Sequence, residues 1–199
     1  MLPPDSVSNS QFGFRQLRGT SMACSFYNDV KSYFEATKSP LYTCSLDAEK
    51  CFDSIWHSAL FYKLIDVIPD NHWSLLHNWY CNLKSIVRWN DCTSNAFIVT
   101  QGTRQGSILS PALFNIFIND LLIILNNSTD GVQIGHLLLN SFAYADDITV
   151  FAATVPGLQR LIDVYVLCMQ VNGNSNLVMQ KRNVWCLASD CMNVTPSGT

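Results

Sequence analysis

The sequence has few positive charges for its length. Its 199 residues include 12 lysines and arginines against 15 acidic residues, which gives a formal net charge of −3 and a pI near 5.7. A domain that grips nucleic acid usually carries a basic face to neutralise phosphates, and no general excess of cations is present here. Glutamate is rarer still, since only Glu35 and Glu49 of the acidic residues are glutamates and the rest are aspartates. Aspartate is the shorter and stiffer metal ligand, so this bias is compatible with a metal site without establishing one.

Zinc-type cysteine pairs, a secretory leader and a membrane span are also missing from the pattern. The eight cysteines form no C-x-x-C pair and have no histidine partner at zinc-ligand spacing, so we expect buried free thiols in a reducing compartment. Met1 to Ser10 has neither a basic nor an apolar leader region, which predicts an intracellular protein that is not secreted. The most hydrophobic stretch, Leu109 to Leu125, is short for a bilayer and is interrupted by three polar residues. It predicts a buried helix and no membrane partner.

What the sequence does have is enough apolar material for a core. Hydrophobic residues make up 48% of the chain and charged residues 14%, which is typical of a globular protein rather than a disordered one. No internal repeat and no Pro/Gly-rich linker divides the chain. We therefore expect a single domain over residues 1–199.

Apolar periodicity and turn residues predict a mixed helical and β chain. Pro69 stops one helix, and Ser110-Pro111 starts another, because serine can cap free N–H groups and proline fits the first turn. The expected helices are 21–37, 71–83, 110–125 and 158–169, together with one that is capped by Asp53 or Ser54 and ends at 67. The expected strands are 41–46, 86–89, 96–100, 141–144, 148–153 and 177–187. Their order predicts an α+β fold, an antiparallel sheet with helices packed on one face.

Three aspartates stand at the ends of predicted strands. Asp146 and Asp147 lie between two apolar β-prone runs, where an ordinary hairpin turn would more often carry Asn-Gly or Asp-Gly. Two acids at the end of a buried hairpin repel each other unless a cation compensates. Asp47 follows another apolar strand, and three converging carboxylates would suit Mg²⁺. Spacing alone leaves open the alternative that all three are acids in surface turns.

Three segments, read in order, resemble the palm motifs of the reverse transcriptase family, and most closely those of non-LTR (LINE-type) retrotransposons. They are SLDAEKCFDSIWH at 45–57, GTRQGSILSPALFNIFINDL at 102–121 and FAYADD at 142–147. Upstream, QFGFRQLRGT at 11–20 resembles the fingers-side segment that precedes the palm. The resemblance implies a polymerase palm at 41–187, partial fingers at 10–40, a tail at 188–199, and no thumb or endonuclease.

The resemblance also assigns roles to individual residues. Asp47 and Asp146 would be the principal metal ligands, Asp147 would complete the acidic site, and the backbone carbonyl of Ala48 would be a further ligand. Two Mg²⁺ ions, about 4 Å apart in such sites and replaceable by Mn²⁺, would activate the attacking hydroxyl and stabilise the leaving pyrophosphate.

Other roles concern the substrates. Phe52 would lie under the incoming sugar and exclude a 2′-hydroxyl, while Gln105 and Gly106 would line the nucleotide and template pocket, where glycine allows close backbone approach. Arg15, Arg18 and Lys181 would contact nucleic acid, and Lys181 would be the family's lysine on the pyrophosphate side. Solvent-exposed cations are the alternative for all three, and a core aromatic is the alternative for Phe52.

The function that the resemblance implies is RNA-directed DNA polymerisation, in which deoxynucleoside triphosphates extend a DNA primer on an RNA template. The chain departs from the family pattern in three places. Cys51 replaces the commoner alanine, and Arg104 replaces the commoner proline. The motif that follows the third one in the family retains only its lysine here. We expect this chain to be incomplete and inactive alone. The alternatives are a non-catalytic retroelement remnant with weak nucleic-acid binding and an RNA-dependent RNA polymerase, although the latter usually carries Gly-Asp-Asp.

Overall fold

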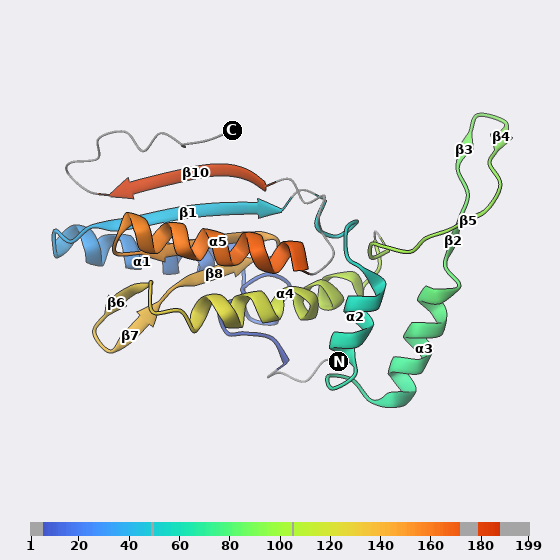
Figure 1. Ribbon diagram of the computed structural model, residues 1–199, viewed down its shortest axis with the longest axis horizontal. Helices are drawn as coiled ribbons and strands as arrows, with labels where there is room; N and C mark the ends of the chain where they lie inside the picture. Colours follow the sequence, from blue (N-terminus) through green and yellow to red (C-terminus); the bar gives the residue numbers. More distant parts are fainter. Residues whose placement is uncertain (1–5, 49, 105, 172–178, 188–199) are drawn as a thin grey trace.

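The computed structural model describes residues 6–48, 50–104, 106–171 and 179–187, the last of these by backbone alone. The helices are α1 (Thr20–Ala36), α2 (His57–Leu64), α3 (Asp70–Cys81), α4 (Ser110–Asn126) and α5 (Val155–Val171). The central sheet is formed by β1 (Leu41–Ala48), β8 (Ser141–Tyr144), β9 (Asp147–Ala152) and β10 (Met179–Leu187). Its strand order is β10-β1-β9-β8, and every neighbouring pair is antiparallel, as Figure 1 shows. The expected α+β class is confirmed.

Helices α4 and α5 pack on one face of this sheet. Cys44 and Leu46 of β1, with Ile148 and Val150 of β9, point to that face and join the apolar residues of the two helices in one buried cluster. Alternate residues of a strand point to opposite faces, so every second residue of β1 and β9 contributes to this core. This arrangement is the one that the sequence predicted.

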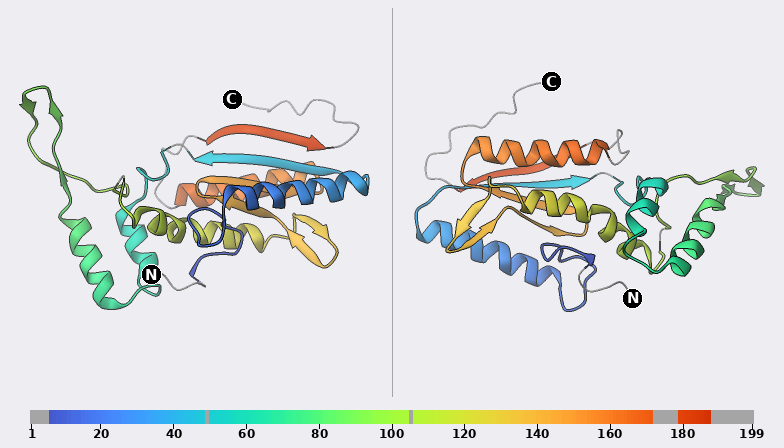
Figure 2. Two further views of the ribbon diagram at one scale, coloured as in Figure 1. Left: turned by 180° about the vertical axis from the view of Figure 1, so that it is seen from behind. Right: turned by 60° about the horizontal axis from the view of Figure 1, so that its bottom comes forward.

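Helix α1 covers the opposite face, which the sequence analysis did not anticipate. Phe142 of β8 and Phe151 of β9 point there and are buried with Val30 and Phe34 of α1. Figure 2 shows α1 and α5 on opposite sides of the sheet. The physical reason is that β8 and β9 are apolar on both faces, and a single layer of helices would leave these large aromatic rings in water.

Residues 50–56 form a loop, and α2 is shorter than expected. A helix capped at Asp53 or Ser54 is prevented because this backbone bonds elsewhere. The N–H groups of both residues donate to the Lys50 carbonyl at 3.0 Å, and the Ile55 carbonyl accepts from the Gly102 N–H at 2.8 Å. The first helical turn therefore begins only at His57. This loop brings the second family-like segment against the first.

The remaining strands form short hairpins outside the sheet. β2 (Lys84–Ser85) pairs with β5 (Phe97–Ile98), and β3 (Arg88–Trp89) pairs with β4 (Cys92–Thr93). Strands therefore occur near the expected ranges 86–89 and 96–100, but residues 88–89 pair with 92–93 and not with the second of these ranges. A further hairpin of β6 (Val132–Ile134) and β7 (Leu137–Leu139) was not predicted. Within the described ranges, no helix combines the length and the hydropathy that crossing a bilayer requires.

Candidate active site

The end of β1 and the β8–β9 turn lie side by side at one end of the sheet. Leu46 pairs with Ile148 across the β1–β9 ladder, and Tyr144 pairs with Asp147 across the β8–β9 ladder. Asp47 directly follows Leu46, so the antiparallel register carries it toward the turn that contains Asp146. Asp47 and Asp146 are half-buried and Asp147 is exposed. The fold thus brings Asp47 close to the turn of Asp146 and Asp147, which lies about a hundred residues later in the sequence.

The Cys51 thiol lies close enough to two of these carboxylates for their negative charges to affect its pKa. Its thiol donates to the Oδ2 atom of Asp146 at 3.4 Å. Burial raises the pKa of this thiol, and the neighbouring charges of Asp146 and Asp47 raise it further. The pKa of Tyr165 in α5 is also raised, by burial first and then by Cys51, Asp47 and Asp146. Both groups therefore resist becoming anions, mainly because they are buried and additionally because the charges of Asp47 and Asp146 disfavour a further negative charge.

The donor set fits a hard divalent cation. Among the residues that the structure describes, no group of three or more histidine, cysteine or acidic side chains is arranged so that it could hold a metal ion by itself. Magnesium does not need such a cage, since it is usually held by one or two carboxylates and completes its shell with water and substrate oxygens. Two half-buried carboxylates with an exposed third beside them can serve that kind of open site.

A cavity of about 520 Å³ opens beside the acidic residues. Its wall is shared by the loop after β1, the start of α4 and Asp146. Phe52 forms part of the wall and is fixed there by stacking on Phe114, with ring centroids 4.5 Å apart. Gly106 also lines it and has a φ of +78°, a conformation that favours glycine, with open space where a Cβ would lie. Gly106 is therefore required by its backbone conformation rather than by close packing.

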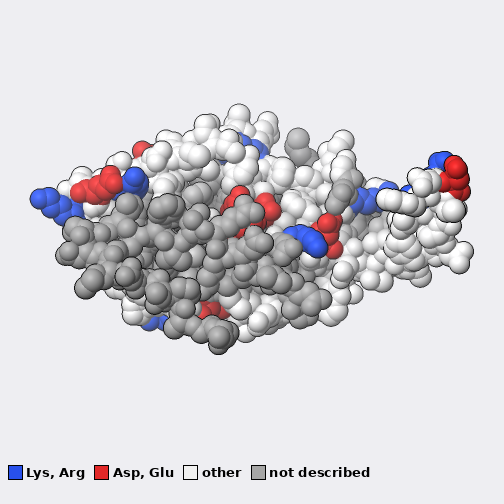
Figure 3. All heavy atoms as spheres, turned by 90° about the horizontal axis from the view of Figure 1, so that it is seen from above, with Lys and Arg blue, Asp and Glu red and all other residues white. Residues whose placement is uncertain are grey.

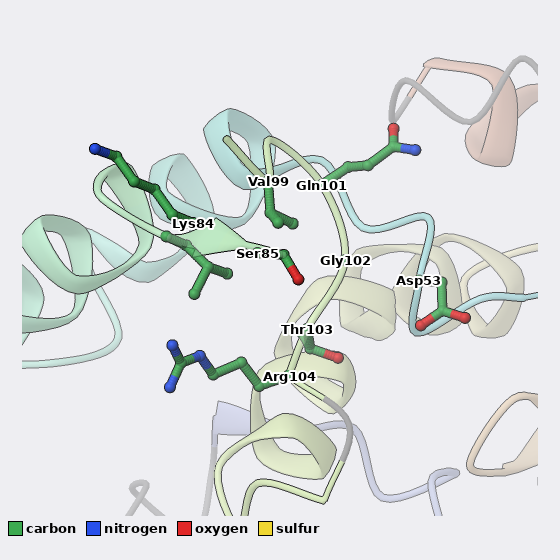
Figure 4. A pocket seen from close by; sticks show the side chains of 9 residues that line it. Asp53, Lys84, Ser85, Val99, Gln101, Gly102, Thr103 and Arg104 are labelled. Carbon is green, nitrogen blue, oxygen red and sulfur yellow. The ribbon is translucent and has the colours of Figure 1, made fainter. Parts of the chain in front are cut away.

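A second cavity, of about 310 Å³, lies on the other side of the 102–104 segment and was not predicted. The two cavities share Asp53, Thr103 and Arg104 in their walls. Figure 4 shows Lys84 and Arg104 on one side of that segment and Asp53 on the other. The Arg104 guanidinium lies over the Trp79 ring, 4.7 Å from its centroid.

These features can be set beside known proteins. Residues 2–184 match the model of a family described as reverse transcriptase (RNA-dependent DNA polymerase). The chain belongs to this family. The resemblance found in the sequence is thereby confirmed, and the chain is homologous to RNA-directed DNA polymerases of non-LTR retrotransposons.

Two relatives illustrate the match. The RNA-directed DNA polymerase from mobile element jockey of Drosophila funebris is 29% identical over 168 residues, which are 80% of this chain and 18% of that protein. The Pol polyprotein from the type-2 retrotransposable element R2DM of Drosophila melanogaster is 33% identical over 123 residues, which are 61% of this chain and 12% of that protein. This reverse transcriptase domain thus spans less than a fifth of the length of either relative.

Solved structures agree on the fold. The apo telomerase of Candida tropicalis, truncated from its C-terminal domain, superposes with a TM-score of 0.64 at 14% identity, covering 89% of this chain and 36% of the other. Telomerase from Candida albicans, solved with a fragment of telomeric RNA, gives 0.64 at 11% identity, covering 90% and 32%. At this identity the likeness concerns the fold alone.

The predicted nucleic-acid contacts of the reverse transcriptase domain are partly engaged within the protein. Arg15 donates to the carbonyls of Val7 and Ser8 at 3.2 and 2.7 Å. Arg18 donates to the carbonyl of Asn9 and lies over the Phe12 ring, and burial followed by repulsion from Arg15 lowers its pKa. Both arginines therefore tie the N-terminal segment together, whatever else they bind.

Two predicted residues lie wholly or partly outside the described part of the chain. Gln105 lies outside the described residues. Lys181 pairs with Leu46 in the β1–β10 ladder, but its side chain lies outside the described part of the chain. Ala48 ends β1 opposite Met179 and its side chain is buried.

Among the described atoms of the face shown in Figure 3, the basic ones form no continuous patch. Basic atoms are scattered singly there, whereas acidic atoms gather near the middle beside atoms that are not described. Sequence reasoning did not identify Cys51, Tyr165 or Gln11 as neighbours of the acidic end. Gln11 and Cys51 carried a signal, because they stand in the segments at 11–20 and 45–57 that resemble the family, whereas Tyr165 carried none.

Proposed function

We propose that this chain is the palm of an RNA-directed DNA polymerase, residues 41–187, with part of the fingers at 10–40. One observation carries the proposal: the register of β1, β9 and β8 brings Asp47 to the turn of Asp146 and Asp147, beside a cavity of about 520 Å³. Family membership supports the proposed reaction class, and this geometry supports the proposed location of the site.

Asp47 and Asp146 supply the carboxylate oxygens for the metal, with Asp147 and the Ala48 carbonyl as further donors. Because the Cys51 thiol bonds one oxygen of Asp146, it orients that carboxylate and leaves the other oxygen for a cation. When bound, two Mg²⁺ ions would lower the pKa of the primer 3′-hydroxyl and neutralise the leaving pyrophosphate. Little covalent work is then left for the protein beyond positioning.

The cavity is proposed as the deoxynucleotide site. Phe52 is held by Phe114 on one side and contacts Phe14 edge-on, with centroids 6.2 Å apart. A ring fixed from two sides cannot move away from a 2′-hydroxyl, so it would select deoxyribose. Gly106 would lie along the same nucleotide, and Gln105 is proposed to join it. The RNA template and DNA primer are proposed to reach Arg15, Arg18 and Lys181.

The metal site is tested by measuring the affinity of this chain for Mn²⁺, with calorimetry or electron paramagnetic resonance. Asp146→Asn keeps the size of the side chain and removes its charge, and we expect the affinity to fall about tenfold, which corresponds to ~1.4 kcal/mol. Asp66→Asn is the matched control, because Asp66 is exposed and lies outside the site. An affinity equal in both variants would remove Asp146 from the metal site.

Primer extension on an RNA template tests the reaction itself. This chain alone is expected to extend no primer, so the test uses the chain joined to the flanking regions of a relative, where extension with Mg²⁺ and deoxynucleotides should depend on Asp146 and not on Asp66. Extension that survives in Asp146→Asn would contradict the assigned role.

A second candidate is a non-catalytic retroelement remnant that binds nucleic acid weakly. The observation that favours it is the engagement of cations within the protein: Lys63 pairs with Asp120 at 2.9 Å, Arg160 pairs with Asp130, and Arg15 and Arg18 bond backbone carbonyls. A chain that binds an RNA–DNA duplex with micromolar or weaker affinity, and that extends no primer with either metal even when joined to those flanking regions, would favour this second function.

A further inference from the structure

The turn that carries Asp146 is strained at its first residue. Tyr144 pairs with Asp147, so Ala145 and Asp146 form a two-residue connection between β8 and β9. Ala145 has a φ of +57°, in the left-handed region that glycine or asparagine usually occupies at such a turn. An alanine remains in this region only where its surroundings hold it there.

One side chain holds both backbone polar groups of Ala145. The Oε1 atom of Gln11 accepts from the Ala145 N–H at 3.0 Å, and its Nε2 donates to the Ala145 carbonyl at 3.1 Å. The same Oε1 accepts from the Gly13 N–H at 2.8 Å. Because two N–H groups point at one atom, that atom must be the oxygen, which fixes the orientation of the amide. Gln11 is fully buried, so water does not compete for these bonds.

Gln11 is itself held in place by the chain around it. The Phe12 N–H donates to the Ala143 carbonyl and the Ala143 N–H donates to the Ser10 carbonyl, both at 2.8 Å, so this segment pairs with β8. The Gly13 carbonyl accepts from Asn115 of α4 at 3.0 Å. A Cβ atom at Gly13 would lie 2.2 Å from the Ala145 nitrogen, so the segment passes directly against the turn.

We infer that Gln11 is a positioning residue, which clamps the Ala145 backbone so that Asp146 and Asp147 leave the β8–β9 turn oriented toward Asp47 and the metal. The inference rests on the proposed function for the metal, whereas the clamp rests on contacts alone. Gln11 touches no reacting atom and acts only through Ala145. It also makes the fingers-side segment part of the acidic site, which is otherwise built from palm strands.

The test compares Gln11→Met with Gln16→Met in this chain. Methionine has nearly the volume of glutamine and neither donor nor acceptor of that strength, and Gln16 is exposed in the same segment. Amide hydrogen exchange, read by nuclear magnetic resonance, reports the Ala145 N–H, and Mn²⁺ binding reports the metal site. For Gln11→Met we expect exchange at Ala145 to become about tenfold faster, relative to amides of α4, and Mn²⁺ affinity to fall severalfold. Gln16→Met should change neither.

The outcomes separate the inference from the proposed function. Unchanged exchange at Ala145 overturns the clamp, and faster exchange with unchanged Mn²⁺ affinity overturns its positioning role. If the wild-type chain binds no Mn²⁺, the proposed function fails, and the positioning role fails with it even where exchange confirms the clamp. Should Gln11→Met not fold, Gln11→Asn replaces it, since an amide one methylene shorter cannot reach both groups of Ala145. It is judged by the same two measurements.

Discussion

Residues near the acidic end of the sheet are constrained mainly by how closely separate segments approach. Gly13 is an example, because its place in a predicted loop gave no reason why it must be glycine. In the structure it passes against Ala145 with no room for a side chain. Cys51 is similar, since its thiol lies between the loop after β1 and Asp146. Both constraints come from segments more than 90 residues away, so local sequence could not predict them.

Gly13→Ala should be strongly destabilising. Its Cβ would meet the Ala145 nitrogen at 2.2 Å, and both backbones are held by hydrogen bonds, so neither can shift freely. Overpacking of this kind costs about 1–3 kcal/mol of unfolding free energy, which urea denaturation would measure. Gly19→Ala is the control, because its nearest neighbour would be 4.0 Å away. Equal losses in the two variants would show that the segment moves aside.

Among the long helices, α4 was predicted closely. Its apolar residues and the Ser110-Pro111 start predicted 110–125, and the helix spans Ser110–Asn126. The mechanism of its start differs from the expectation. The N-cap position is Leu109, and the Ser110 hydroxyl donates to the Arg104 carbonyl at 2.5 Å instead of capping the helix. This hydrogen bond connects the 102–104 segment to the start of α4, and it depends on the tertiary fold.

Leu122→Ala tests how much the packing of α4 contributes to the free energy of unfolding. Leu122 is fully buried, and its removal leaves a cavity against the sheet, at a cost of about 2–5 kcal/mol. Ile123→Ala changes the next residue, which is 45% exposed, and should cost much less. Chemical denaturation of both variants gives the difference. Similar costs would mean that α4 packs more loosely than its burial indicates.

At the scale of the whole molecule, two layers of helices enclose a sheet whose acidic end stays accessible. The same enclosure buries Tyr165 of α5, whose hydroxyl has no hydrogen-bond partner among the described residues. Burial and the nearby carboxylates raise its pKa above the ordinary value of 10.0. A pKa raised by folding adds stability that is complete below pH 10 and is lost as the pH rises toward the folded value.

Tyr165→Phe should therefore change the response of the whole fold to alkali. At pH 7 we expect unchanged or slightly greater stability, because the variant no longer buries an unpaired hydroxyl. Above pH 10 its stability should fall less steeply than that of the wild type, since one buried ionisation is removed. Urea denaturation at pH 8 and pH 11 measures both effects. A steeper alkaline loss in the variant would contradict the assignment.

The sequence by itself determined the family, the α+β class and the order of most elements. These follow from ordered motifs and from apolar periodicity, which each segment carries locally. Only the tertiary structure decided that α1 covers the second face, that α2 starts at His57, and that Gln11 grips the Ala145 turn. Each of these depends on hydrogen bonds or packing between distant segments. Such contacts exist only once the register of the sheet and the path of the chain are fixed.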